Sequence, residues 1–581
     1  MGNTYFIGLS VTYHDPAIAV VDPFRKILFA EATERHLQLK RALNCEADNL
    51  YRIVELIQDY CPGAQRLHIA FNWRHGRPFY EHFCAATHYF TPQGLLRERF
   101  AKRATFLEKY KIFHMLACQT QAMKVGGIHL VRMVREAFPG VELCFHDFDH
   151  HLTHAAFACY ASPFREADCI VVDSYGEGGS LGFYRYVDGR LTLVRLARGI
   201  ESLGFFYMKL TELCGFDWIK GEEWKVMGLA SYGSLDPEIH QLFQSMIEVD
   251  ELGLKQRLPE IRSGMAILEK RFRNCRPMEA KDLAFTGQAF FADLMLRLLV
   301  NFRSLNLSEN LVLCGGCALN SSFNGQILER SGYRRLYIPP APADDGTAVG
   351  AAMLACDRVY RERQESSREP LSPYLGSTAS TDSLQRLVRF GSGLQIRHLP
   401  DNLAQECARL LAEGRLVGWM QGRAEFGPRA LGNRSILADP RRADMKQKIN
   451  ESVKFREEFR PFAPAILHEF GEHYFENYVE SPYMERALRF RDEVRDRVPA
   501  VVHVDRTGRL QTVKREWNAR FHDLLQAFHQ ITEVPVLLNT SFNVMGKPMI
   551  HTVEDAVSVF LTTGLDDLAI GDYLLSKPKQ S

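Results

Sequence analysis

Histidines crowd one short stretch of the sequence, HDFDHHLTHAAF at residues 146–157. Histidine accounts for 20 of the 581 residues, yet four of the nine residues from 146 to 154 are histidines. If HHLTHAAF is helical, His150 and His154 stand four residues apart and project from one face. Two imidazoles at this spacing can hold one metal ion. A peptidase of the H-E-x-x-H type would need Glu at 151, where this chain has His, so that class is disfavoured. A capped helix with hydrogen-bonded histidines is the alternative.

Carboxylates follow two apolar strands elsewhere in the chain. Asp173 ends a strand in IVVDSYGEGGS, and Asp344 and Asp345 follow a strand in YIPPAPADDGTAVGAA. Strand ends face the ligand cleft of an open α/β fold, so we expect Asp173 and Asp344 to join the two histidines. Two His and two Asp suit Fe(II), Mn(II) or Zn(II) better than Ca(II). Each aspartate taken singly is more typical of a helix cap or a turn.

Glycines mark a candidate nucleotide site in LVLCGGCALN. Gly315 and Gly316 follow a strand directly, and residues without a Cβ let the backbone approach a nucleotide. Cys314 and Cys317 form a C-x-x-C pair that could be redox-active, but no second pair exists for a structural zinc. We therefore expect both cysteines to be small buried neighbours. Lys225 adds a cation before a glycine-bearing turn in GEEWKVMGLASYG.

The densest run of cations lies between residues 421 and 460. This run holds ten Lys or Arg against six Asp or Glu, a local excess of four positive charges. Guanidinium groups bind phosphate and carboxylate through paired hydrogen bonds, so the run predicts a phosphate pocket. A nucleic-acid face and a solvated surface are the alternatives. The cations that stand among glycine, proline and phenylalanine are Arg429, Arg434, Lys454, Arg456 and Arg460. Asn539 and Ser541 follow at a strand end in LLNTSFN.

The elements that would position these residues form a repeated pattern. The order strand–turn–strand–turn–strand occurs first over residues 5–33 and again over 169–197, each time followed by helical sequence. The pattern predicts a duplicated α/β unit, with two unrelated β-meanders as the alternative. Beyond residue 356 the chain becomes charged and then rich in Ser and Pro, which is typical of a linker. Further apolar strands then predict a second α/β domain of about 200 residues.

Composition narrows the class of protein. A net charge of +1 excludes a globally basic nucleic-acid binder. The first residues, MGNTYFIGLS, lack the basic and apolar regions of a secretory signal, and we find no uncharged apolar stretch of about 18 residues. Thirteen cysteines scattered through the chain favour reduced thiols. We therefore expect a cytoplasmic enzyme with no membrane and no nucleic acid as partner.

Six segments, taken together, resemble the NodU/CmcH carbamoyltransferase family, which includes O-carbamoyltransferases of nodulation factors and antibiotics. The segments are HHLTHAA, GEEWKVMGLASYG, GGCALN, GRAEFGPRALGNRSILADPR, KFREEFRPFAPA and PVLLNTSFN. The resemblance runs from about residue 5 to residue 576. It implies an actin-like (ASKHA) duplicated α/β domain over 1–356, a linker over 357–380 and a YrdC-like α/β domain over 381–581.

The resemblance also implies a two-step reaction. In the YrdC-like domain, carbamoyl phosphate and ATP with Mg yield carbamoyl-adenylate. In the actin-like domain, the hydroxyl of a small-molecule acceptor, an antibiotic or other secondary metabolite, attacks the carbamoyl carbon and AMP leaves. The adenylate is a mixed anhydride and therefore a reactive acyl donor, and a metal can act as a Lewis acid or orient the phosphate.

Residue roles carry over from the family's motifs. Those implied to hold carbamoyl phosphate and nucleotide phosphates are Arg429, Arg434, Lys454, Arg460, Arg509, Asn539 and Ser541, with Arg429 and Lys454 as catalytic candidates. Those implied to bind the adenylate in the first domain are Lys40, Lys225, Gly315, Gly316 and Asn320. The metal site of the family is of the iron type, Fe(II), with Mn or Zn as alternatives. The residues that match its ligand positions are His150, His154, Asp173 and Asp344.

His14, in YHDP, matches a family position beside the acceptor, where it acts either as a general base or, as we favour, as a hydrogen-bonding positioner. Two departures from the family stand out: DSYGEGGS in place of the commoner D-G-x-G-E, and Glu223 and Trp224 before Lys225. An enzyme that makes threonylcarbamoyl-adenylate for tRNA is the runner-up, and a non-catalytic nucleotide-binding module comes third. The acceptor, the native metal and the oligomeric state stay open, a homodimer among them.

Overall fold

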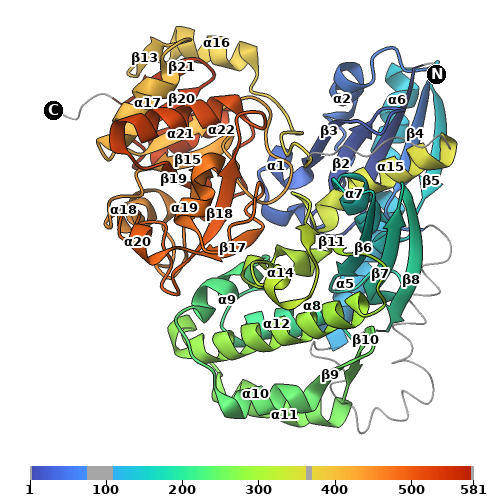
Figure 1. Ribbon diagram of the computed structural model, residues 1–581. Coiled ribbons are helices and arrows are strands. Elements are labelled where there is room, and N and C mark those ends of the chain that lie inside the picture. Colours follow the sequence, from blue (N-terminus) through green and yellow to red (C-terminus); the bar gives the residue numbers. More distant parts are fainter. Residues whose placement is uncertain (1–2, 75–108, 200, 361–369, 578–581) are drawn as a thin grey trace. The chain divides into compact units, whose positions relative to one another are not determined.

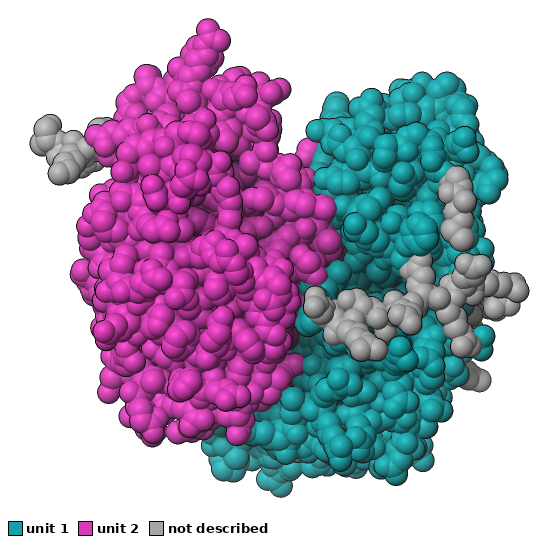
Figure 2. Space-filling view, turned by 45° about the horizontal axis from the view of Figure 1, so that its top comes forward, with its two compact units in different colours: residues 1–34, 41–320, 326–371 teal, residues 35–40, 321–325, 372–581 magenta. Residues whose placement is uncertain are grey.

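A computed structural model describes residues 3–74, 109–199, 201–360 and 370–577 (Figure 1). The chain divides into two compact units, coloured separately in Figure 2. The first unit comprises residues 1–34, 41–320 and 326–371, and the second comprises 35–40, 321–325 and 372–581. The sequence did not reveal that two short segments, 35–40 and 321–325, pack with the second unit.

The first unit contains two five-stranded sheets of one topology. The strand orders are β3-β2-β1-β4-β5 and β8-β7-β6-β11-β12. In each sheet the first three strands in this order pair antiparallel with one another. The last two strands run parallel to the third, which is β1 in one sheet and β6 in the other. In both sheets, two parallel strands continue a three-stranded antiparallel meander in the same order. The predicted duplicated α/β unit is therefore confirmed. The strands are β1 (Thr4–Ser10), β2 (Ala17–Val21), β3 (Ile27–Ala32), β4 (Arg66–Phe71), β5 (Glu142–Asp147), β6 (Glu166–Val172), β7 (Gly179–Val187), β8 (Arg190–Arg198), β11 (Asn310–Cys314) and β12 (Arg335–Tyr337).

Two helices, α7 (His150–Tyr160) and α15 (Thr347–Val359), pack on each other, and α15 also packs on β1, β2 and β4. Small residues permit the close approach. A Cβ on Gly350 would lie 1.9 Å from the Thr153 carbonyl oxygen, and one on Gly8 would lie 1.8 Å from that of Ala348. The helix α15 continues to Val359, three residues into the predicted linker, although its buried residues end at Cys356. Residues 361–369 of that linker lie outside the described residues.

The remaining helices of the first unit include a long apolar one. They are α2 (Ile53–Tyr60), α5 (Lys109–Val125), α6 (Ile128–Ala137), α8 (Leu203–Leu213), α9 (Glu223–Ala230), α10 (Pro237–Met246), α11 (Leu258–Arg271), α12 (Lys281–Arg303) and α14 (Ile327–Arg330). A segment over Pro277–Arg303, which includes α12, has the length and composition of a membrane span. However, 61% of its apolar window is buried within the protein, as in a core helix.

The second unit is built on one mixed sheet of nine strands in the order β13-β21-β20-β14-β15-β19-β16-β18-β17. Its large apolar core lies between this sheet and helices that include α17 (Leu403–Ala412) and α21 (Ala519–Thr532), which pack on each other. The strands are β13 (Gln395–His398), β14 (Val417–Met420), β15 (Arg434–Ala438), β16 (Ala463–Leu467), β17 (Arg486–Arg489), β18 (Thr507–Val513), β19 (Val536–Ser541), β20 (Asp567–Ile570) and β21 (Tyr573–Ser576).

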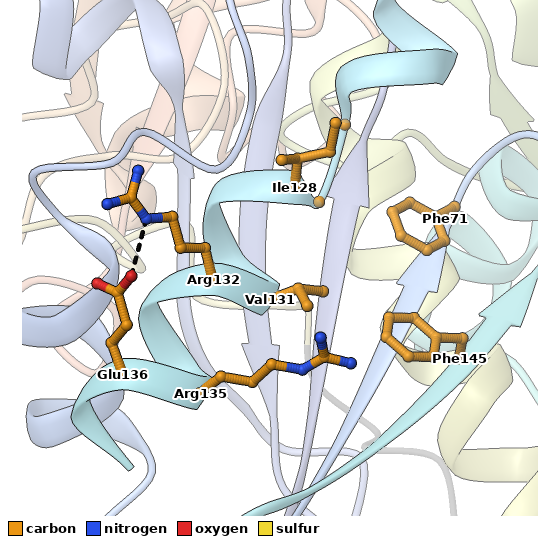
Figure 3. Close-up of a pocket in the computed structure, with 9 residues that line it drawn as sticks. Phe71, Ile128, Val131, Arg132, Arg135, Glu136 and Phe145 are labelled. Atoms are coloured by element: carbon orange, nitrogen blue, oxygen red, sulfur yellow. Dashed lines mark hydrogen bonds and ion pairs between the residues drawn. The ribbon is translucent and has the colours of Figure 1, made fainter. Parts of the chain in front are cut away.

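A pocket of about 470 Å³ lies over β4, β5 and α6 (Figure 3). Phe71, Val131 and Phe145 form its apolar wall, and Arg135 extends over it. No residue that the sequence singled out for chemistry lines this pocket, so the candidate site lies elsewhere.

We predict that Gly350→Ala destabilises the first unit. The added methyl would overlap the Thr153 carbonyl and force α7 and α15 apart, and overpacking of this kind typically costs about 1–3 kcal/mol. Thermal unfolding measures the effect. Gly140→Ala is the matched control, since its Cβ would meet no atom within 4 Å. Equal unfolding temperatures for the two variants would contradict the close approach.

Candidate functional site

The structure brings together the two histidines and two aspartates that the sequence proposed as metal ligands. His150, His154, Asp173 and Asp344 each place one donor atom within 4.8 Å of the others. The His150 Nε2 lies 3.3 Å from Asp173 Oδ2 and 3.6 Å from Asp344 Oδ1, and the corresponding distances from His154 Nε2 are 3.6 and 3.5 Å. The two Nε2 atoms lie 3.2 Å apart. We call these four buried residues the His–Asp quartet.

The histidines of the quartet owe their direction to the start of α7. Asp149 is the N-cap of this helix, and its side chain accepts the backbone N–H of Leu152 at 3.1 Å. The helix begins at His150, so His154 follows one turn later on the same face. The capped helix that was the alternative to a metal site is therefore present, and it carries the histidines toward the aspartates.

The aspartates arrive from two different connections. Asp173 follows β6 directly, and its Oδ1 accepts the backbone N–H of Ser174 at 2.7 Å, while Oδ2 faces the histidines. Asp344 begins the turn η4 (Asp344–Gly346) before α15. Its carbonyl accepts the hydroxyl of Ser10 on β1 at 2.9 Å. Asp345, the next residue, is not part of the quartet.

Mutual pairing sets the charges of the quartet. Burial alone would lower the pKa of His150, but hydrogen bonds to Asp173 and Asp344 raise it to about 10. The pKa of His154 is raised by the same partners against the same burial. Burial opposes ionisation of both carboxyls, yet the histidines hold the pKa values of Asp173 and Asp344 below their ordinary range. The pairing therefore favours the charged form of each of the four groups.

The donor set fits a first-row divalent metal. Atoms that each lie about 2.1 Å from one ion are about 3 to 3.5 Å apart, which is close to the separations within the quartet. Two imidazole nitrogens and two carboxylate oxygens suit iron, manganese or zinc, and do not distinguish among them.

His14 lies beside the quartet. Its Nδ1 is 3.0 Å from Asp15 Oδ2 and 3.6 Å from Asp344 Oδ2. Arg41 in turn binds Asp15 through Nε at 3.1 Å and donates to the Trp218 carbonyl at 3.1 Å. Although burial would raise the pKa of Asp15, Arg41 and His14 lower it, so Asp15 is an anion that orients the imidazole. Sequence analysis missed both Asp15 and Arg41.

The glycine pair contacts the quartet. Gly315 has φ of 88°, and a Cβ there would lie 2.3 Å from the Val172 carbonyl. A Cβ on Gly316 would lie 3.1 Å from Asp173 Oδ1. Glycine at both positions thus lets the backbone after β11 approach Asp173. Of the flanking cysteines, Cys314 is buried as predicted, but Cys317 is partly exposed because it lies in the turn that follows.

The other predicted adenylate residues of the first unit have partners of their own. Asn320 forms a paired amide contact with Gln288 on α12, at 3.1 and 2.9 Å, and Tyr207 donates to the same Gln288 at 2.7 Å. Lys225 pairs with Glu222 at 2.7 Å and lies 5.3 Å from the centre of the Phe216 ring. Their contact with an adenylate stays a prediction.

Cations converge in the second unit. We define the cation cluster as Arg429, Lys454, Arg456, Arg460 and Arg509. Burial and the neighbouring guanidinium groups lower the pKa of Arg509 and of Lys454 far below their ordinary values, and lower that of Arg456 to about 9. Within the described chain, Glu457 is the acid paired with the cluster, through Arg460 at 2.9 Å. The cluster therefore carries an excess of positive charge that an anion would neutralise.

Strand ends and an irregular helix position the cluster. Arg509 lies on β18, and Arg429 in the loop between β14 and β15. Lys454 ends the π-helical segment η5 (Asn450–Lys454), which closes with a 2.6 Å bond from the Phe455 N–H to the Asn450 carbonyl. Such π-helical turns are frequent at functional sites.

Lys454 and the strand β19 form one network. The ammonium of Lys454 donates to the Ser541 carbonyl, to Ser541 Oγ at 3.3 Å and to Asn543 Oδ1 at 2.7 Å. Asn539 donates to Gln511 Oε1 at 2.7 Å, and its own Oδ1 is buried without a hydrogen-bond partner. The predicted group Lys454, Asn539 and Ser541 therefore lies near one end of β19.

Arg434 differs from the other predicted phosphate ligands. Its NH1 and NH2 groups donate to backbone carbonyls, including those of Gln421 at 2.6 Å and Ser377 at 3.0 Å. Glu425 holds the same loop by accepting three backbone N–H groups at 2.7–3.1 Å. Because its NH1 and NH2 groups donate to backbone carbonyls, Arg434 fixes the loop that carries Arg429. Phosphate binding by Arg434 stays a prediction.

Lys40 lies in the second unit rather than with the first-unit residues beside which the sequence analysis placed it. Its charge helps to lower the pKa of Lys454, so it belongs to the surroundings of the cation cluster. The contact of Lys40 with an adenylate stays a prediction. Arg456 was noted as a cation but not assigned to the site, and its place two residues after Lys454 was the available signal.

We predict that His150→Ala with His154→Ala abolishes tight binding of Co(II) or Zn(II). Two carboxylates alone hold such ions weakly. Metal content after gel filtration measures the loss. His151→Ala is the control, since His151 lies outside the quartet and its ring packs against Gly176. A double variant that keeps its metal would assign the histidines another purpose.

We also predict that anion binding to the cation cluster is accompanied by proton uptake. The pKa of Lys454 is lowered in the free protein, and a bound anion favours the charged form, so affinity should fall as pH rises through that lowered pKa. Sulfate, whose charge is constant over this range, is the probe, and calorimetry in buffers of different ionisation enthalpy gives the proton count. Lys454→Met should bind sulfate more weakly and without uptake; uptake unchanged in this variant would assign the proton elsewhere.

Two family descriptions match most of this chain. Residues 5–353 match the family described as Carbamoyltransferase N-terminus, and residues 408–577 match Carbamoyltransferase C-terminus. The nodulation protein NolO of Bradyrhizobium diazoefficiens is 36% identical over 74% of this chain and 79% of its own length. An uncharacterized protein of Synechocystis is 31% identical over 99% of this chain and 97% of its own.

The nodulation protein NolNO of Sinorhizobium fredii is 37% identical over 74% of this chain, and the match spans 63% of that protein's length. Among solved structures, full-length HypF in a phosphate- and nucleotide-bound form shares 10% identity over 63% of this chain and 56% of its own, with a TM-score of 0.35, which is too low to bear on the fold. The two family matches cover the quartet and the cation cluster, and the predicted resemblance is confirmed: the chain belongs to the carbamoyltransferase family.

Proposed function

We propose that this protein is an ATP-dependent O-carbamoyltransferase that forms carbamoyl-adenylate and transfers the carbamoyl group to a hydroxyl of a small molecule. The single observation that carries the proposal is the pairing of two different centres in one carbamoyltransferase chain. One is an excess of buried cations, suited to phosphates, and the other is a buried His–Asp quartet, suited to a metal. A one-step transfer would not need both.

The cation cluster would carry out the first step. Carbamoyl phosphate and water give carbamate and phosphate, and a carbamate oxygen then attacks the α-phosphorus of ATP, which releases pyrophosphate. Both steps move negative charge among phosphoryl oxygens, which fixed guanidinium groups stabilise. Arg429 and Arg509 would bind these oxygens. Lys454, which Ser541 and Asn543 hold in place, would be a proton donor at a fixed position. Magnesium would accompany ATP.

The first unit would carry out the transfer. The acceptor oxygen forms a bond to the carbamoyl carbon as the bond to AMP breaks, and the hydroxyl proton must leave. Asp15 binds Nδ1 of His14, so His14 Nε2 is the nitrogen that could face a hydroxyl, as a positioner or as a base. The metal, when bound, supplies Lewis acidity or orients the phosphate. The glycine pair would let the backbone lie against the nucleotide, with Asn320 and Lys225 nearby.

The topologies support the proposed domain identities. Two sheets of identical order agree with an actin-like first domain over about 1–356, and the mixed nine-stranded sheet would be the YrdC-like domain over about 381–581. An antibiotic or another secondary metabolite is the acceptor class we propose, from the family resemblance.

The deciding experiment is incubation with ATP and carbamoyl phosphate in the absence of any acceptor. We expect AMP and pyrophosphate to form only when carbamoyl phosphate is present. Arg429→Ala and Lys454→Ala should each lower this rate by at least tenfold, because each removes a charge-assisted phosphate contact worth about 1.5–3 kcal/mol. Arg515→Ala is the control, since Arg515 is an exposed cation paired with Asp523.

The His150→Ala and His154→Ala double variant should keep pyrophosphate release and lose acceptor carbamoylation. Release of ADP instead of AMP would point to a kinase-like reaction. Dependence on threonine and bicarbonate in place of carbamoyl phosphate would identify the threonylcarbamoyl-adenylate enzyme. Either result would replace the proposed function.

A further inference from the structure

Three consecutive residues after β4, Asn72, Trp73 and Arg74, contact the elements that carry the His–Asp quartet. The sequence analysis did not single out this segment, and none of its members is a quartet ligand. Asn72 and Trp73 are buried, and Arg74 is partly exposed. All three contacts fall within the first unit.

The first two residues of the segment contact His150 itself. The Trp73 ring stacks on the His150 ring, with centroids 4.7 Å apart and an angle of 30° between the planes. Asn72 Nδ2 lies 3.4 Å from His150 Nδ1 and donates to Thr347 Oγ1 at 2.8 Å. The Thr347 hydroxyl in turn donates to the carbonyl of Asp344. Asn72 thereby links a histidine and an aspartate of the quartet.

Arg74 joins the other two elements. Its NH2 donates to Asp149 Oδ2 at 3.2 Å, and Asp149 caps the helix that begins at His150. Its Nε and its backbone N–H donate to the two oxygens of Glu177, at 2.6 and 2.8 Å. Glu177 lies in the loop that follows Asp173 and is only 1% exposed. One guanidinium therefore spans the start of α7 and the connection from β6 to β7.

We propose that Arg74 is a positioning residue of the metal centre, which holds the α7 start and the Asp173 loop at the spacing that the quartet requires. The inference rests on the proposed metal site. Groups that orient metal ligands typically contribute 10- to 100-fold to metal affinity. Arg74 suits this purpose because its planar fork bonds to two carboxylates in fixed directions, which the compact ammonium of lysine does not reproduce.

The test measures Co(II) binding to the full chain by competition with a chromophoric chelator, together with the visible absorption of the bound ion. Arg74→Met should weaken Co(II) affinity 10- to 100-fold and change the absorption spectrum, since the donors would lose their fixed directions. Arg74→Lys should give a smaller loss of the same kind. Pyrophosphate release should stay at the wild-type level in both variants.

Arg52→Met is the matched control. Arg52 pairs with the buried Glu31 at 2.5 Å, as Arg74 pairs with the buried Glu177, and neither Arg52 nor Glu31 is a quartet ligand. Its loss should lower the unfolding temperature without changing Co(II) affinity. Equal Co(II) loss in Arg52→Met and Arg74→Met would overturn the inference, because the effect would then be general destabilisation.

Two further outcomes separate this inference from the metal site beneath it. Wild-type Co(II) affinity in Arg74→Met, with loss in the His150→Ala and His154→Ala double variant, would overturn the role of Arg74 alone. Undiminished affinity in that double variant would overturn the metal centre itself. If Arg74→Met does not fold, the folded Arg74→Lys variant decides: weakened affinity supports the inference, and wild-type affinity overturns it.

Discussion

The burial of four ionisable side chains within 4.8 Å of one another is the constraint on which the first unit depends. A buried charge without a partner costs several kcal/mol, so the quartet is tolerable only while its two histidines and two aspartates stay paired or hold a metal. They come from α7, from the end of β6 and from the turn before α15. The close packing of α7 on α15, which Gly350 permits, brings two of these places together, and α7 also packs on β6.

The second unit gathers buried groups of one charge rather than pairing groups of opposite charge. Its cation cluster is not balanced internally: apart from Glu457, the groups that act on Arg456 and Arg509 are other cations. Burial is the main cause of their lowered pKa values, and repulsion from the neighbouring cations adds to it. The quartet thus pairs groups of opposite charge, whereas the cluster gathers groups of one charge.

Arginines divide between these two uses. The NH1 and NH2 groups of Arg434 donate to backbone carbonyls and fix a loop. Arg74 and Arg41 bind carboxylates beside the first-unit site. Arg456 and Arg509 have buried donors with no hydrogen-bond partner in the described structure. The amino-acid type is the same in every case, and the surroundings decide which carbonyl, carboxylate or neighbouring cation each guanidinium meets.

The sequence by itself determined the duplicated α/β unit, because strand and turn patterns are local, and it determined the quartet, because helical spacing and strand ends are local signals as well. It also determined the family, since its motifs occur in order along the chain. The tertiary structure alone decided that Lys40 lies in the second unit, that Arg434 faces inward, and that Asn72, Trp73 and Arg74 contact the quartet. These facts depend on contacts between segments distant in sequence, and no periodicity or spacing within one segment records which distant carbonyl, carboxylate or ring a side chain will meet.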